Sequence, residues 1–169
     1  MIKQRLADVI NAQINAEFYS AYLYLSMSAY FQNKGLPGFA NWMRVQFEEE
    51  QFHALRFYDY VNERGGRVLL TTFETPKHEW TSIVEAFEDV LTHELHVTDL
   101  INNLVDVSIE EKDHASNSFF KWFVDEQVEE EANVEQILSQ LRLIDGKGDG
   151  ILMLDRELAT RVFVPPVIA

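Results

Sequence analysis

The 169-residue sequence predicts an all-α protein, namely a four-helix bundle with one long crossover between the second and third helices, plus a short C-terminal fifth helix. Four long stretches repeat apolar residues at alternating steps of three and four, which places those residues on one face of an α-helix. Clusters of glycine and proline separate the stretches, and the middle connection is long. The chain length suits a single domain with a sizeable core.

The first two helices are expected to form an antiparallel hairpin. The first spans residues 2–33 and ends before Gly35 and Pro37, in the usual order of a C-terminal glycine followed by proline. The second follows this short connection and runs to Arg64, where two consecutive glycines end it.

The third and fourth helices are expected to form a second hairpin. Ser82 and Glu85 have the spacing of a capping box at the start of the third helix, and Ser108 and Glu111 repeat it near the start of the fourth. The fourth helix ends after Leu143, ahead of three closely spaced glycines.

The connection between the two hairpins is long enough to cross the bundle. About 15 residues with Pro76 and no helical pattern separate the second helix from the third. They span up to about 50 Å at ~3.3 Å per residue, whereas helices of this length measure roughly 40 Å. The second and third helices are therefore predicted to be parallel.

Residues 1–145 are expected to form the bundle, and residues 146–169 a glycine hinge, the fifth helix and a tail within the same single domain. The fifth helix is predicted over residues 151–162, ahead of two prolines. Its apolar strip consists of Ile151, Leu154 and Leu158. This strip is too small to stabilise an isolated helix, and the glycine hinge is expected to turn the helix away from the bundle.

Polar residues interrupt the apolar stripe of each long helix near its middle. They are Glu17, Glu50, His53, Glu94, Gln127 and Glu130. An ionised carboxylate in a low-dielectric core costs several kcal/mol unless it is paired or binds a metal. No Lys or Arg falls on these stripes, so the simplest compensation is a shared cluster of cations.

The spacing of these residues repeats along the chain. Glu17 and Glu50 are 33 residues apart, and so are Glu94 and Gln127. In each half the second helix supplies two of the polar residues at positions i and i+3, which lie on one face and can bind the same ion or adjacent ions. The pattern indicates a tandem pair of helical hairpins that holds two metal ions between them.

The composition limits the type of partner and of metal site. A formal net charge of −14 argues against nucleic acid and anionic membranes as partners. The absence of cysteine excludes disulfides, thiolate sites and iron–sulfur clusters. Carboxylate, imidazole and amide ligands suit hard or borderline ions such as iron and manganese. The N-terminus has no apolar run of signal-peptide length, so a cytoplasmic protein is expected.

These residues resemble the ferritin family over essentially the whole chain, and within it the non-haem ferritins of bacteria and archaea. The motifs that carry the resemblance are Glu17 with Tyr24, Glu50-x-x-His53, Glu94, and Trp122-x-x-x-x-Gln127-x-x-Glu130. The resemblance implies a ferritin-like four-helix bundle, and it assigns a role to each polar residue.

By this resemblance, Glu50 bridges two iron ions. The first ion is held by Glu17, Glu50 and His53, and the second by Glu50, Glu94 and Glu130. Gln127 lies close by, and Tyr24 sits beside the pair as an electron donor. The resemblance also implies a third iron site, whose ligands are Glu49, Glu126 and Glu129, with Glu130 shared.

The implied function is a ferroxidase that oxidises Fe(II) with dioxygen or peroxide and stores ferric oxyhydroxide inside a homo-oligomeric cage of 24 subunits. The fifth helices of four subunits would pack around a fourfold axis. Haem is not expected, because Gln51 stands where bacterioferritins have a haem-ligating methionine.

Three alternatives remain open at the level of sequence. The first is another di-iron enzyme on the same bundle, such as a relative of rubrerythrin, although the second Glu-x-x-His motif is absent. The second is a cage that mineralises iron passively. The third is a helical scaffold whose buried carboxylates pair with Lys or Arg from elsewhere. Zinc and manganese bind the same ligand types as iron.

Overall fold

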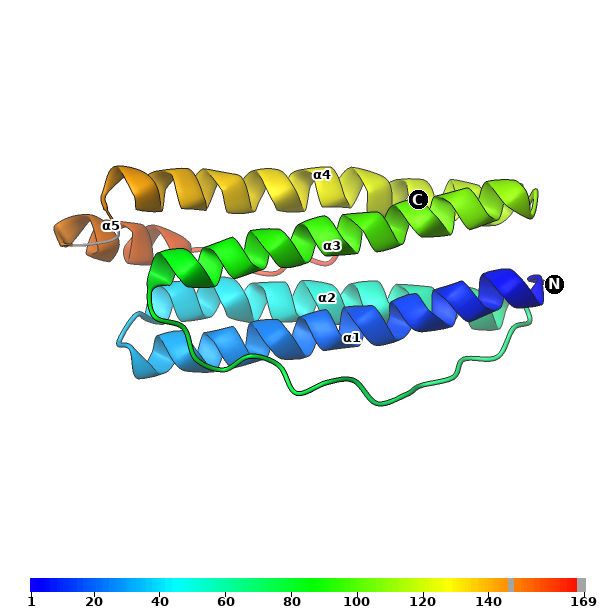
Figure 1. Cartoon of the computed structure of the whole chain (residues 1–169), viewed down its shortest axis with the longest axis horizontal. Coiled ribbons are helices and arrows are strands. Elements are labelled where there is room, and N and C mark those ends of the chain that lie inside the picture. The colour runs from blue at the N-terminus through cyan, green and yellow to red at the C-terminus, as the bar shows by residue number, and fades with distance from the viewer. Residues whose placement is uncertain (146–147, 167–169) are drawn as a thin grey trace.

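Four long helices and one short helix form the fold over the residues that the structure describes, 1–145 and 148–166 (Figure 1). The helices of this computed structural model are α1 (Gln4–Asn33), α2 (Pro37–Glu63), α3 (Ile83–Glu110), α4 (His114–Leu143) and α5 (Asp149–Leu158). The predicted all-α bundle is confirmed, with helix ends within a few residues of those expected for α1 to α4. None of the described helices is long and apolar enough to span a membrane.

The long crossover runs beside α1 and brings α3 back to the end of the bundle where α2 begins, so α2 and α3 are parallel as predicted (Figure 1). Two asparagine side chains of α1 hold its backbone. Asn11 donates to the carbonyl of Arg67 at 3.0 Å and accepts from the amide of Leu69 at 2.8 Å. Asn15 accepts from the amide of Thr71 at 2.8 Å. The crossover is thus fixed by hydrogen bonds rather than by regular structure of its own.

One of the two predicted capping boxes is confirmed and the other is wrong. The Ser82 hydroxyl accepts from the amide of Glu85 at 3.0 Å and opens α3. Ser108 lies inside α3 instead, where its hydroxyl donates to the carbonyl of Val105 at 2.6 Å. The cap of α4 is Asp113, which accepts from the amide of Ser116 at 3.0 Å. Ser108 is itself fully buried, next to the buried side chains of Leu104 and Val107, and this packing outweighs the local capping signal.

The fifth helix also differs from its prediction. It begins and ends earlier than expected, and it packs against α2 instead of turning away from the bundle. The apolar strip predicted to contact other copies, Ile151, Leu154 and Leu158, is buried within this chain. The Asp155 carboxylate accepts from the amides of Gly38 and Phe39 at 2.8 and 3.0 Å, which are otherwise unsatisfied donors at the start of α2. The predicted hinge residue Gly146 lies outside the described residues.

The buried apolar side chains form two clusters, one at each end of the bundle. Along α1, Ile14 belongs to one cluster and Leu23 to the other, and Glu17 lies between them. The same change of cluster occurs on α2, α3 and α4 at the polar residues of each stripe. The fold therefore places one polar layer between two dry apolar layers.

Candidate metal centre

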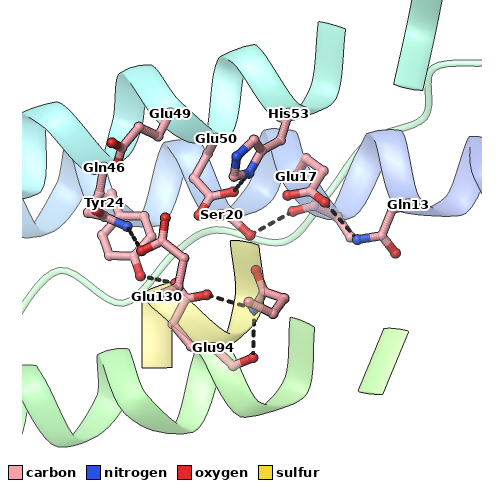
Figure 2. A network of polar contacts seen from close by, with 12 residues as sticks. Gln13, Glu17, Ser20, Tyr24, Gln46, Glu49, Glu50, His53, Glu94 and Glu130 are labelled. Carbon is pink, nitrogen blue, oxygen red and sulfur yellow. Dashed lines mark hydrogen bonds and ion pairs between the residues drawn. The ribbon is translucent and has the colours of Figure 1, made fainter. Parts of the chain in front are cut away.

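The polar layer between the two apolar clusters takes residues from all four long helices. Its members are Glu17 of α1, Glu50 and His53 of α2, Glu94 of α3, and Gln127 and Glu130 of α4, each at most 5% exposed. Figure 2 shows the labelled members pointing toward one another from facing helices. The structure therefore brings all six sequence-predicted residues into one buried layer.

Three of these residues form a compact group of metal-ligand atoms. Ligand atoms of Glu17, Glu50 and His53 all lie within 4.8 Å of one another, and all three side chains are buried. The Nδ1 atom of His53 lies 3.4 Å from Oε2 of Glu50, which is too long for a well-formed hydrogen bond. This spacing is typical of ligands around an ion rather than of groups that bond to each other.

The carboxylates of this group leave oxygen atoms without a hydrogen-bond partner. Gln13 donates its side-chain amide to Oε1 of Glu17 at 2.8 Å and thereby orients that carboxylate. The other oxygen of Glu17 and Oε2 of Glu50 are buried with no partner. Buried acceptors of this kind carry a desolvation cost that a bound cation removes.

The other half of the layer has more internal hydrogen bonds. The Tyr24 hydroxyl donates to one oxygen of Glu94, and the Gln127 amide donates to the other at 3.2 Å. Glu130 accepts from the side-chain amide of Gln46 at 3.0 Å. These donors hold both carboxylates in place without neutralising their charge, so each is still able to bind a cation.

Burial is the main influence on the carboxylates of the layer. Burial raises the pKa of Glu17, Glu50 and Glu94, and burial together with the neighbouring Glu94 charge raises the pKa of Glu130 to about 8. Within 1–145 and 148–166, no Lys or Arg forms an ion pair with any of these four carboxylates. The buried carboxylates therefore favour protons or cations, and a metal ion must displace those protons.

The predicted third-site residues lie beside this layer, at the surface of α2 and α4. Glu49 and Glu126 are partly buried and Glu129 is exposed. In the described chain, Glu17, Glu50 and His53 are the one group of three or more His, Asp or Glu residues whose ligand atoms all lie within 4.8 Å of one another, so Glu49, Glu126 and Glu129 do not form a comparable group. Glu49 is instead paired with Arg161, whose Nη2 lies 2.7 Å from Oε2 of Glu49.

Three residues of the site's surroundings were not predicted from the sequence. Gln46 lies on the same helical stripe as Glu50, and Gln13 lies one turn before Glu17, so periodicity contains a signal for both. Arg161 follows the last helix and has no such signal. Its position depends on how α5 docks, which is a tertiary contact.

Comparison with known proteins agrees with the helical-bundle fold. Residues 7–144 match the family model described as ferritin-like domain. The chain is 42% identical to a bacterial non-heme ferritin of Staphylococcus saprophyticus over 96% of this chain and 98% of that protein. It is 43% identical to one of Bacteroides fragilis, over 95% of this chain and 100% of that protein.

The chain belongs to the ferritin family. Among solved structures, an open-pore ferritin of Archaeoglobus fulgidus is 51% identical, with a TM-score of 0.94 over 96% of this chain and 100% of that one. A closed form of the Archaeoglobus fulgidus ferritin, engineered by mutagenesis, has a TM-score of 0.95 at 51% identity, over 97% of this ferritin and 100% of that chain. The predicted resemblance and fold class are confirmed, and family membership supports iron storage as the function of this chain.

Proposed function

We propose that this ferritin oxidises Fe(II) to Fe(III) in the polar layer and stores the product as ferric oxyhydroxide inside a cage. The observation that carries the proposal is the buried group of Glu17, Glu50 and His53, whose carboxylates include unpartnered oxygens and have no Lys or Arg partner among the described residues. A layer of buried carboxylates between two apolar clusters gains stability from cations.

In this proposal Glu50 is shared between two iron sites. Glu17, Glu50 and His53 hold the first Fe(II), and Glu50, Glu94 and Glu130 hold the second. Carboxylates suit both labile Fe(II) and the harder Fe(III) that leaves. Two Fe(II) ions held close together supply the two electrons that convert dioxygen to hydrogen peroxide, or hydrogen peroxide to water.

The remaining predicted residues have supporting roles. Gln127 orients Glu94 through its side-chain amide. Tyr24 donates its hydroxyl to the same carboxylate, and this contact supports a role for Tyr24 as the donor of a further electron. Glu49, Glu126 and Glu129 form the proposed third iron site, with Glu130 shared. The relatives named as ferritins support a homo-oligomer with a hollow interior, for which we propose 24 subunits and a cytoplasmic location.

Removal of Glu50 and Glu130 is expected to slow iron oxidation at least about tenfold, because each site loses a ligand and the bridge between the sites is lost. Apo-protein is loaded anaerobically with two Fe(II) per chain, oxygen is admitted, and the near-ultraviolet absorbance of Fe(III) is followed for wild type and Glu50→Ala/Glu130→Ala.

In the same assay Tyr24→Phe is expected to keep two Fe(II) bound and to slow repeated turnover.

The matched control is Glu48→Ala/Glu135→Ala, which removes the same charge from the same two helices outside the layer. It is expected to behave as wild type. Equal slow rates in wild type and the Glu50→Ala/Glu130→Ala variant would contradict the proposal and favour a passive store or a scaffold. Fast turnover with peroxide but not with dioxygen would identify peroxide as the oxidant.

A further inference from the structure

The chain that follows α5 runs back along α2 rather than away from the molecule. The Asn41 side chain of α2 donates to the carbonyls of Leu158 and Arg161 at 3.2 and 2.9 Å, and so fixes the start of this tail, residues 159–166. Further along, the ring of Phe163 lies 6.2 Å from that of Phe52. Two separated contacts on one helix give the tail a defined path.

This path places Arg161 on Glu49, a proposed ligand of the third iron site. The guanidinium of Arg161 lies over the ring of Trp42, with its central carbon 4.7 Å from the ring centroid. Its Nη2 donates to Oε2 of Glu49 at 2.7 Å. Both side chains are about a quarter exposed at most, 22% for Arg161 and 24% for Glu49, so the pair is only partly screened by water.

The charge of Arg161 acts on more than one carboxylate of the proposed third site. Burial raises the pKa of Glu49 above its ordinary value, and the neighbouring Glu126 and Glu129 charges add to this rise. The charge of Arg161 opposes it. It also acts in the same direction on Glu130, the carboxylate that the third site shares with the buried pair. A positive charge that favours these carboxylates as anions also competes with, and repels, a metal ion that approaches them.

Arg161 contacts Glu49 through a single hydrogen bond, so a metal ion can replace Arg161 as the partner of this carboxylate. The Nη1 atom of Arg161 is buried without a hydrogen-bond partner, so the guanidinium lacks the two-fold, bidentate contact that makes Arg–carboxylate pairs strong. A divalent ion offers Glu49 a stronger interaction than this single bond. Displacement of Arg161 by an ion therefore needs no unfolding of the bundle.

We propose that Arg161 is a built-in counter-cation of the third metal site, which holds Glu49 until a divalent ion displaces it. The inference rests on the proposed function of the same site. Its consequence is an order of filling, in which the buried pair is occupied first and the third site only at higher metal concentration.

The test is equilibrium dialysis of the assembled protein against Zn²⁺, which binds the same ligand types without redox chemistry. Arg161→Met keeps an aliphatic side chain over Trp42 and removes the charge. It is expected to tighten the weakest of three Zn²⁺ ions per chain by at least about tenfold, since one charge-assisted hydrogen bond no longer competes. Arg156→Met, which removes the same charge from an exposed position of α5, is expected to match wild type.

A second substitution assigns the effect to Glu49. Arg161→Met/Glu49→Gln is expected to lose the gained affinity, because the released ligand is no longer a carboxylate. Equal third-ion affinity in wild type and Arg161→Met, a weaker third ion in Arg161→Met, or a gain that persists in the double variant would each overturn the proposal. Failure of the proposed function has a different signature, namely the absence of two tightly bound ions in wild type.

Discussion

Replacement of both Glu50 and Glu130 by glutamine is expected to make the metal-free protein more stable at pH 8, on the order of a few kcal/mol. Most substitutions of buried hydrogen-bonded residues destabilise a protein. Here the opposite is expected, because the wild-type carboxylates are buried with raised pKa values and form no ion pair with Lys or Arg in the described chain. Glutamine keeps the shape of glutamate and removes the charge.

The pH dependence follows from the direction of the pKa shifts. The pKa of Glu130 is raised from 4.5 to about 8 on folding, so between these values the folded chain binds a proton that the unfolded chain has lost. The free energy of unfolding of apo wild type therefore falls as the pH rises from about 4.5 to about 8. In the variant this decline is expected to be much smaller.

Calorimetry of the apo-protein in excess chelator across this pH range measures the effect. Glu48→Gln/Glu135→Gln provides the control, since it removes the same charge from residues outside the layer. Saturating Zn²⁺ is expected to reverse the ranking, because binding to the folded state stabilises wild type more than a variant with fewer ligands. A variant less stable than wild type at pH 8 without metal would show that the carboxylates are structural rather than functional.

The second large effect is expected at Gly38, where α2 meets α5. A Cβ atom at this position would lie 1.6 Å from the backbone oxygen and 2.5 Å from the carbonyl carbon of Asp155. Backbone atoms cannot avoid such a contact by a rotamer change, so Gly38→Ala must displace α5. The two capping bonds from Asp155 and the burial of the α5 apolar strip would be lost, a cost of several kcal/mol.

Gly38→Ala is therefore expected to lower the melting temperature and to expose the amides of α5 to hydrogen exchange, while the bundle helices stay protected. The control is Gly150→Ala, where the three atoms nearest to an added Cβ all belong to the side chain of Ile144, at 2.8 to 3.3 Å, and none is a backbone atom. If α5 stayed protected in Gly38→Ala, the docking of α5 against α2 would be wrong. The same release of α5 is expected to free Glu49 from Arg161.

The parts of the fold predicted from the sequence are those with a repeating local signal. The four long helices follow from apolar periodicity. The polar layer follows from polar residues that interrupt this periodicity at a repeated spacing, such as Glu17 and Glu50. The apolar repeat is visible in the sequence because helix–helix packing requires apolar residues on one face at every turn. The polar residues are visible as exceptions to that repeat. Glu50 and His53 are predicted as ligands from the sequence alone, since they lie one turn apart on the same helical stripe.

The parts that were wrong or missing depend on tertiary contacts with a weak local signal. The sequence predicts that the apolar strip of α5 contacts other copies of the chain. Instead, the Asp155 carboxylate and the absence of a side chain at Gly38 allow α5 to pack against α2 of its own chain. Neither residue is unusual in sequence. Arg161 was missed for the same reason, because its pairing with Glu49 exists only once α5 has docked.

The central claim is that the buried layer binds a pair of metal ions bridged by Glu50. Its most direct test is anomalous X-ray diffraction from crystals of the assembled protein soaked anaerobically with Fe(II). The account predicts two anomalous peaks about 3.5–4 Å apart, one contacting Glu17, Glu50 and His53 and the other contacting Glu50, Glu94 and Glu130. Peaks confined to exposed carboxylates, with none inside the layer, would contradict it.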